Sequence, residues 1–527
     1  MQFPDCRWNR KGMVKIMRIT NKIMQNNSLT NLNRNKVYAD QLTTQLSSKK
    51  KITRPSDDPI IAIRSLRLNT SITQLTQYYE KNVSDASSWL KATEEAVSTT
   101  ISVVTDMYEQ CTKGAEGVKT PSDREKILES LKQLRDEVYS TGNTDYAGRY
   151  LFSGYRTDTP LTFQGATKQQ YTITEQLDTA AIGSYNYIDT GDLSSLTEAN
   201  AQSGITTEEK DVVSYDVHRI QLAYSSCDKD GLPVISYYDE TGTEQKIELT
   251  ADDVVSVNSE NPNPYTSAQS SATGVTFIPE TGELILSDAV YNKLMAVKDD
   301  TATDDINEGE IRITYNKSEW NKNELRPEHY YACESEGVKY NEDFLTNATN
   351  DVDGQIISYD MGLNQTLRVN TNAKEVYVPG IGRDVDDLIR VTDDTIKMQN
   401  AVDTLDKMLE KDPENADLKE RLNAANKALD YLSNKMQRMF ESGLTKMQNH
   451  LDTANLALTQ AGARGQRLDL IKNRLGSQQT TFKTLSSENE DVDFEEVAVQ
   501  LSSAELSYQA ALMATGKIAQ TTLLNYL

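Results

Sequence analysis

The stretch LKERLNAANKALDYLSNKMQRM, residues 418–439, decides the fold class of this 527-residue chain. Its apolar side chains recur every three or four residues, at Leu418, Leu422, Ala425, Leu429, Leu432, Met436 and Met439. This spacing is typical of an amphipathic α-helix. After a stutter, an insertion of four residues into the repeat, the pattern continues from Met447 to Phe482. It predicts one helix on the order of 100 Å long. A compact domain cannot contain such a helix, so we predict an elongated, rod-like molecule.

Further helices are expected before this stretch. The prolines of the segment Arg54-Pro55-Ser56-Asp57-Asp58-Pro59 break the chain, and apolar residues then recur at helical spacing from Ile72 to Cys111. A helix from about residue 384 should end before Asp412. A sparse amphipathic helix is expected over residues 18–52.

The two ends of the chain carry narrow apolar seams. The seam of the first helix includes Leu29, Leu42 and Leu46. After a polar break at 486–493, heptad spacing predicts a last helix with packing residues at Val497, Leu501, Ala504, Tyr508, Ala511 and Ile518, with Leu512 beside them. Such seams bury too little surface to stand alone. We therefore expect both ends to order on assembly.

Between residues 155 and 378 the helical period disappears, and short β-branched or aromatic runs take its place. The runs lie at 171–174, 220–222, 247–249, 275–277, 284–286, 311–315, 356–359 and 376–378. Thr241-Gly242 and Thr281-Gly282 are turn signals between them. These patterns predict one or two antiparallel β domains inserted into the helical part.

The charge of the chain is concentrated in this middle region. The whole chain has 55 Lys and Arg against 79 Asp and Glu, a net charge of −24. Residues 155–375 hold 15 of the basic and 39 of the acidic residues, so the remainder is neutral. An acidic surface repels phosphate backbones, and we expect no nucleic-acid partner. No apolar run approaches a membrane span, and no signal-peptide core lies near Met1, so we expect no membrane association.

Candidate chemical groups are few. Gly380-Ile381-Gly382 lacks the third glycine of a dinucleotide fingerprint, and we interpret it as a loop. His329 and Cys333, near Glu328 and Glu334, have the composition of a metal site, but their surroundings predict a loop or strand on which four-residue spacing does not converge. We therefore predict no metal there.

Two charged features have alternative interpretations. The acidic groups Asp299-Asp300, Asp304-Asp305 and Asp351 with Asp353 are either calcium ligands or a solvated surface, and they lack the spacing of an EF-hand loop. The run Lys49-Lys50-Lys51 either contacts acidic partners or is solvated, and we favour solvation. No catalytic constellation was found, so we predict no enzyme, no cofactor and no metal.

Several motifs resemble the bacterial flagellar hook-associated protein 3 family, within the flagellin superfamily. They are Met17-Arg18-Ile19-Thr20, Arg54-Pro55-Ser56-Asp57-Asp58-Pro59, Asn143-Thr144-Asp145, Tyr150-Leu151-Phe152-Ser153-Gly154-Tyr155 and Leu523-Leu524-Asn525-Tyr526-Leu527. The resemblance covers 17–157 and 376–527. The LFSG and LLNYL segments favour this family over flagellin. The family usually begins near Met17, so Met1, Met13 and Met17 are alternative starts.

The resemblance and the patterns together predict a mainly α fold with inserted β structure. The expected parts are a disordered extension (1–16), a terminal coiled-coil domain (17–53 with 488–527), a helical rod domain (54–154 with 376–487) and one or more acidic, β-rich outer domains (155–375). Arg54, Pro55, Asp57, Asp58 and Pro59 are expected to fix the bend between the two helical layers.

The resemblance implies a structural junction protein of the flagellum. Its implied partners are hook-associated protein 1, flagellin, further copies in a ring and a flagellar export chaperone. Its implied location is the extracellular flagellum, after export by the flagellar type III apparatus without a cleaved signal peptide. The alternatives are a flagellin-type filament subunit, or an enzyme or adhesin carried by the β insert.

Overall fold

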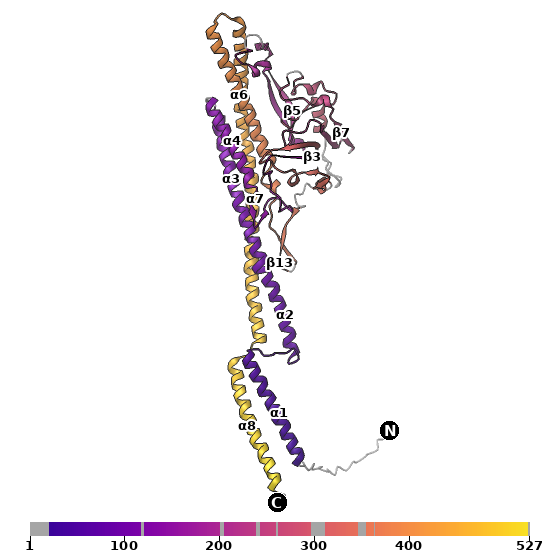
Figure 1. Ribbon diagram of the computed structural model, residues 1–527, viewed down its shortest axis with the longest axis vertical. Coiled ribbons are helices and arrows are strands. Elements are labelled where there is room, and N and C mark those ends of the chain that lie inside the picture. The colour runs from indigo at the N-terminus through magenta and orange to yellow at the C-terminus, as the bar shows by residue number, and fades with distance from the viewer. Residues whose placement is uncertain are drawn as a thin grey trace, which may run out of the picture. The chain divides into compact units, whose positions relative to one another are not determined.

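A computed structural model describes residues 21–116, 121–200, 205–238, 243–259, 262–296, 311–345, 355–362 and 364–524 (Figure 1). The chain divides into two compact units. The terminal unit combines residues up to 81 with those from 471 onward, and the central unit holds residues 82–470. The four-part division expected from the sequence stays a prediction.

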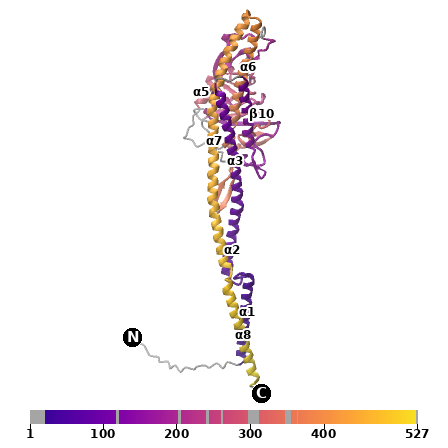
Figure 2. The same cartoon turned by 90° about the vertical axis from the view of Figure 1, so that its left-hand side faces the viewer.

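The terminal unit is built from helices. Helix α1 (Asn21–Ser48) lies beside α8 (Phe494–Leu524) in both views (Figure 1, Figure 2). The end of α1 meets the start of α8, so the two helices run antiparallel. Helix α2 (Pro59–Thr76) and the last part of α7 (Ala416–Glu490) complete this unit. The 75 residues of α7 form one unbroken helix, about 110 Å long at 1.5 Å per residue, as its apolar period predicted.

The helices of the central unit are α3 (Val83–Ala115), α4 (Pro121–Thr141), α6 (Pro379–Lys411) and most of α7. A π-helical segment, Gln77–Asn82, precedes α3. Apolar side chains of α3 such as Trp89, Val97 and Met107 are fully buried. The buried residues of α3, from Val83 to Gly114, recur mostly at steps of three or four, and this spacing is the reason that the segment is helical and packs along one face.

The strands of the central unit lie to one side of these helices (Figure 1). A six-stranded antiparallel sheet has the order β12-β11-β3-β10-β6-β7, formed by Val338–Tyr340, Ala332–Ser335, Thr167–Leu177, Ile311–Trp320, Val234–Tyr238 and Glu244–Glu248. A four-stranded antiparallel sheet has the order β4-β5-β9-β8, formed by Ile182–Asp189, Val213–Gln221, Glu283–Leu286 and Val275–Ile278. Two hairpins, β1-β2 (Asp145–Tyr146, Arg149–Tyr150) and β13-β14 (Ser358–Gly362, Gln365–Arg368), and the short helix α5 (Asp288–Met295) complete the unit.

An aromatic cluster holds the six-stranded sheet together. Trp320 stacks on Phe163 with ring centroids 4.7 Å apart, and Tyr171 and Tyr224 meet its edge at 5.2 Å. The indole N–H of Trp320 donates to the backbone carbonyl of Gln169 at 2.8 Å. These rings bury a large apolar area, and the indole N–H has a hydrogen-bond acceptor, so the cluster stabilises the core of the sheet.

The expected fold class, long helices with an inserted antiparallel β part, is confirmed. Seven of the eight predicted strand runs overlap observed strands, and Thr281-Gly282 forms the turn between β8 and β9. The strand prediction for residues 376–378 is wrong. The N–H of Tyr377 donates to the carbonyl of Ala373 in a turn, and its buried ring meets Phe152 at 4.9 Å. Burial of an aromatic side chain, not strand pairing, explains this apolar run.

The loop interpretation of Gly380-Ile381-Gly382 is also wrong, because these residues form the first turn of α6. Pro379 occupies the first helical position, where a missing N–H costs nothing. The N–H of Gly382 donates to the Tyr139 hydroxyl at 2.8 Å. A β-carbon at Gly382 would lie 2.8 Å from that oxygen, so the close approach of α4 requires a glycine.

Some expectations lie outside the described residues. They concern the extension 1–16, the turn Thr241-Gly242, the acidic groups Asp299-Asp300, Asp304-Asp305 and Asp351 with Asp353, and the last residues 525–527. None of the described helices combines the length and apolar character that crossing a lipid bilayer requires.

Candidate assembly site

The segment at Arg54–Pro59 forms a tight turn that starts helix α2. The carboxylate of Asp57 accepts the backbone N–H of Arg54 at 2.9 Å, and this hydrogen bond lowers the pKa of Asp57. The carboxylate of Asp58 caps α2 by accepting the N–H groups of Ile60 and Ile61 at 2.8 and 3.2 Å. Pro59 takes the first helical position. An Asp cap followed by proline is a strong start signal, which explains why the sequence revealed this boundary.

The first two residues of this turn lie on the surface. Arg54 and Pro55 are exposed. Their expected role in fixing a bend between layers stays a prediction, because it concerns parts whose relative placement is not described.

The α1–α8 seam has a small apolar core. Leu42, Val497 and Ala504 are buried, with 3%, 7% and 6% of their surface exposed. Leu46 and Leu501 are partly buried and pack against them. The structure thus brings together five of the residues that heptad spacing singled out.

The remaining seam residues lie farther from this core. Tyr508 and Ala511 are half-buried. Leu29 and Leu512 are exposed, at 51% and 46%, and the side chain of Ile518 lies outside the described residues. Their role in assembly stays a prediction.

Two linkers meet at the base of the seam. The backbone N–H of Lys51 donates to the carbonyl of Glu490 at 2.6 Å, and the N–H of Val492 donates to the carbonyl of Lys49 at 3.2 Å. Lys50 and Asp491 face each other in this antiparallel bridge. We call the residues Lys49–Lys51 and Glu490–Val492 the linker joint.

Charge complementarity reinforces the linker joint. The Lys50 ammonium lies 2.7 Å from Asp491 and 3.0 Å from Glu490, and hydrogen bonds to these carboxylates raise the pKa of Lys50. The second oxygen of Glu490 accepts the hydroxyl of Ser65 and the amide of Asn69. Hydrogen bonding from Ser65, followed by that from Lys50, lowers the pKa of Glu490.

The interpretation of residues 49–51 as solvated lysines missed this ion pair within the chain, although 45% of the Lys50 side chain is exposed. The available signal was the opposite charge of two segments, three lysines after α1 and the acidic residues Glu488, Glu490 and Asp491 at the end of α7. Sequence reasoning did not connect these segments, because they are separated by more than 400 residues.

Large apolar side chains are exposed on α1, α2 and α8 of the terminal unit. They are Ile23, Met24, Leu29, Val37 and Tyr38 on α1, Ile60, Ile63 and Leu66 on α2, and Phe494, Val499, Leu506, Leu512 and Met513 on α8. Exposed apolar side chains in such numbers are typical of surfaces that pack against another protein. This unit is the candidate assembly site.

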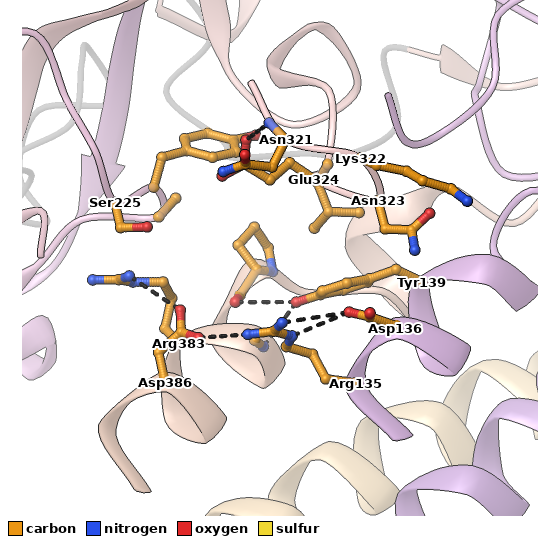
Figure 3. A pocket seen from close by; sticks show the side chains of 15 residues that line it. Arg135, Asp136, Tyr139, Ser225, Asn321, Lys322, Asn323, Glu324, Arg383 and Asp386 are labelled. Atoms are coloured by element: carbon orange, nitrogen blue, oxygen red, sulfur yellow. Dashed lines mark hydrogen bonds and ion pairs between the residues drawn. The ribbon is translucent and has the colours of Figure 1, made fainter. Parts of the chain in front are cut away.

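A cavity of about 200 Å³ in the central unit is a second candidate (Figure 3). Arg135 of α4 pairs with Asp386 of α6 at 2.6 Å, and Arg383 pairs with the same carboxylate at 3.4 Å. The Tyr139 hydroxyl donates to the carbonyl of Pro379 at 3.3 Å. These interactions link α4 to the start of α6, which indicates a packing role for the cavity lining.

The possible metal ligands make other contacts. His329 is buried and lies 3.1 Å from the carbonyl of Pro160, and burial lowers its pKa. Cys333 is buried in β11, where burial raises the pKa of its thiol. His450 of α7 contacts Asp384 at 2.8 Å. Among the residues that the structure describes, no three His, Cys, Asp or Glu side chains are arranged to hold a metal ion.

Parts of this chain are similar in sequence to known flagellar proteins. Residues 19–157 match the bacterial flagellin N-terminal helical region. Flagellar hook-associated protein 3 of Salmonella typhimurium is 28% identical over 169 residues, 31% of this chain and 53% of that protein. Part of this chain is thus similar in sequence to flagellar hook-associated protein 3. The Escherichia coli hook-associated protein 3 is 26% identical over 144 residues, 27% of this chain and 45% of that protein.

The chain spans about half the length of the curated hook-associated proteins that it matches. A flagellin of Clostridium tyrobutyricum is 30% identical over 128 residues, 24% of this chain and 34% of that protein. Among solved structures, FlgL from Xanthomonas campestris has a TM-score of 0.30 and 10% identity, over 80% of this chain and 99% of that chain. The junction protein FlgL from Legionella pneumophila has a TM-score of 0.25 and 8% identity, over 82% of this chain and all of that chain. These whole-chain similarities are weak.

Proposed function

We propose that this chain is a structural component of the bacterial flagellum, assembled through its terminal helices. The apolar side chains exposed on α1, α2 and α8 support this role, because water would otherwise contact them. The match to the flagellin N-terminal helical region covers α1 and α2. Burial of these side chains between neighbouring copies would provide the driving force for assembly.

The specific role that we propose is a junction between hook-associated protein 1 and the flagellin filament. Two curated hook-associated protein 3 relatives match over larger shares of their length, 53% and 45%, than the flagellin does at 34%. In this role the partners are hook-associated protein 1, flagellin, further copies of the chain and an export chaperone. The proposed location is the extracellular flagellum, reached through the flagellar type III apparatus. We propose no enzymatic activity for it.

Electron microscopy of purified flagella with antibodies against residues 155–375 tests the location. We expect label confined to the boundary between hook and filament. Label along the whole filament would contradict the junction role and favour the filament-subunit alternative.

A second experiment tests the packing role of the terminal helices. Deletion of Val497–Leu527 should abolish filament growth in cells, and Leu42→Asp should weaken it strongly because it places a charge in the seam. Val338→Asp is the matched control, since Val338 is exposed in β12 of the central unit. Normal growth with the truncated protein would show that the packing assignment is wrong.

The alternative of a filament subunit is motivated by the similarity to the Clostridium flagellin. A filament subunit should extend into long fibres when purified protein is seeded at high concentration. A junction protein should stop at short assemblies, so the length of the fibres separates the two roles.

A further inference from the structure

The seam between α1 and α8 does not by itself define how the two helices align. Among the side chains that the structure describes on these helices of 28 and 31 residues, only Leu42, Val497 and Ala504 are buried. On α8 the heptad that starts at Val497 continues with Ala504 and Ala511. Sliding one helix by seven residues would therefore exchange similar small apolar contacts. Repeats of this kind need a unique feature to specify one register.

The linker joint supplies contacts that occur once. Val492 donates to the carbonyl of Lys49 and also packs against the apolar core of the seam. The amide of Gln45, in the last turn of α1, donates to the carbonyl of Lys51 at 2.7 Å. The joint is therefore connected to both helices at the end where the seam begins.

Glu490 is the residue at which the segments of the terminal unit converge. Its carboxylate accepts hydrogen bonds from Lys50 of the first linker and from Ser65 and Asn69 of α2. Ser65 and Asn69 lie one turn apart on the same face of α2. Glu490 is also the last residue of α7, and only 17% of its side chain is exposed. The neighbouring Asn489 amide donates to the carbonyl of Ile61 in α2 at 3.1 Å.

We propose that the linker joint sets the register of α1 against α8, with Glu490 as its central positioning residue. A slip of one heptad would move the helices by about 10 Å along each other. Such a slip would break the Lys50–Asp491 bridge and separate Glu490 from Lys50. The inference rests on the proposed assembly role only for its biological purpose, because register is a property of the single chain.

Cross-linking in the purified full-length protein tests the proposal. The Tyr38 hydroxyl of α1 lies 3.4 Å from the side-chain oxygen of Gln500 of α8, so this pair reports the observed register. Cysteines are placed at Tyr38 and Gln500, or at Tyr38 and Ser507, one heptad farther along α8. A short bifunctional maleimide then links them in a Cys6→Ser background. Cys111, Cys227 and Cys333 are buried and are retained.

We expect the 38–500 product to dominate in the parent protein. The combination of Lys50→Ala with Glu490→Ala should lower the ratio of the 38–500 to the 38–507 product several-fold. Lys50→Asp should lower this ratio as well, and Lys50→Asp with Asp491→Lys should restore it, because the exchanged charges still attract. A purely structural loss of one side chain would not be rescued in this way.

Two results would overturn the proposal: an unchanged ratio in the Lys50 and Glu490 variants, or no preference for the 38–500 product in the parent. Failure of the junction role would appear separately, in the location of the protein on flagella. A chain with the correct register that is absent from flagella would contradict only the proposed function.

Discussion

Arg219 of β5 and Asp387 of α6 form a two-point ion pair inside the central unit. The two guanidinium nitrogens lie 3.1 and 2.7 Å from the two carboxylate oxygens. Glu283 of β9 and Arg390 of α6 complete a cluster of four charges, with Arg390 2.8 Å from Glu283. The cluster attaches the four-stranded sheet to α6 at a place where Glu283 and Asp387 are almost inaccessible to water.

The two arginines determine the ionisation of this cluster. Burial alone would raise the pKa of Glu283, but the charges of Arg390 and Arg219 outweigh it and lower the pKa to about 2. Burial likewise raises the pKa of Asp387, but the charge and hydrogen bonds of Arg219, together with the charges of Arg390 and Lys446, outweigh it and lower the pKa. Both carboxylates are therefore charged at neutral pH, and each depends on the arginines.

The first prediction is that Arg219→Met destabilises the central unit by about 3–5 kcal/mol, because it leaves buried carboxylates without their partner. Hydrogen exchange of the β5 and β9 amides measures the loss. Lys168→Met is the control, since Lys168 pairs with Glu319 on the exposed surface, where solvent screens such pairs and they contribute little to stability. Equal effects of the two substitutions would contradict the buried role of the cluster.

The second prediction concerns the buried carboxyl of Glu175 in β3. Burial raises its pKa from 4.5 to about 7, although the Tyr315 hydroxyl, the N–H of Ala223 and the charge of Arg383 all lower it. A raised pKa means that the folded state holds the proton more tightly than the unfolded state. The contribution of Glu175 to the free energy of unfolding is therefore fully present below about pH 4.5 and is lost as the pH rises through about 7. The loss amounts to about 3 kcal/mol.

Substitution Glu175→Gln should remove this pH dependence and stabilise the six-stranded sheet above pH 7. The glutamine carbonyl retains an acceptor for the Tyr315 hydroxyl and the N–H of Ala223, which both bind one oxygen of Glu175. Hydrogen exchange of the β10 amides, measured between pH 5 and 8, reports the unfolding of this sheet and thus the effect. Glu334→Gln, at an exposed position of β11, should leave the pH profile unchanged. If Glu175→Gln left the pH dependence of stability unchanged, Glu175 would not be its source.

The third prediction compares two helical glycines. At Gly114 of α3 an added β-carbon would lie 2.5 Å from the ring of Phe440, whereas at Gly462 of α7 the nearest atom is 3.9 Å away. Gly114→Ala should therefore destabilise the central unit by about 1–3 kcal/mol through overpacking. Gly462→Ala should stabilise it by about 1 kcal/mol, because alanine favours the helix. Thermal unfolding should show shifts of opposite sign, and shifts of the same sign would show that the Phe440 contact does not limit α3.

The fourth prediction concerns the cap of α2. Asp58→Ala removes the acceptor for the N–H groups of Ile60 and Ile61 and should cost about 1 kcal/mol of helix stability. Asp58→Asn keeps an acceptor oxygen and should cost much less. Hydrogen exchange at the first amides of α2 measures both variants. Identical protection in wild type and Asp58→Ala would show that the carboxylate does not cap the helix.

Local patterns made many elements predictable. The period of three to four residues identified α7, because one continuous apolar face is enough to define a helix. The cap of Asp58 and the proline after it likewise act within four residues. The predictions for 376–378 and 380–382 are wrong because the ring of Tyr377 and the hydroxyl of Tyr139 contact residues distant in sequence.

The sequence by itself determined the helices, most strands, the acidic middle region and the narrow terminal seams, since each depends on neighbouring residues. Only the tertiary structure decided which linkers meet and which charges pair. Lys50 and Glu490 are 440 positions apart, and Arg219 and Asp387 are 168 apart. Contacts at such separations arise from the packing of whole elements, so a local pattern of charge can mark a segment but does not identify its partner.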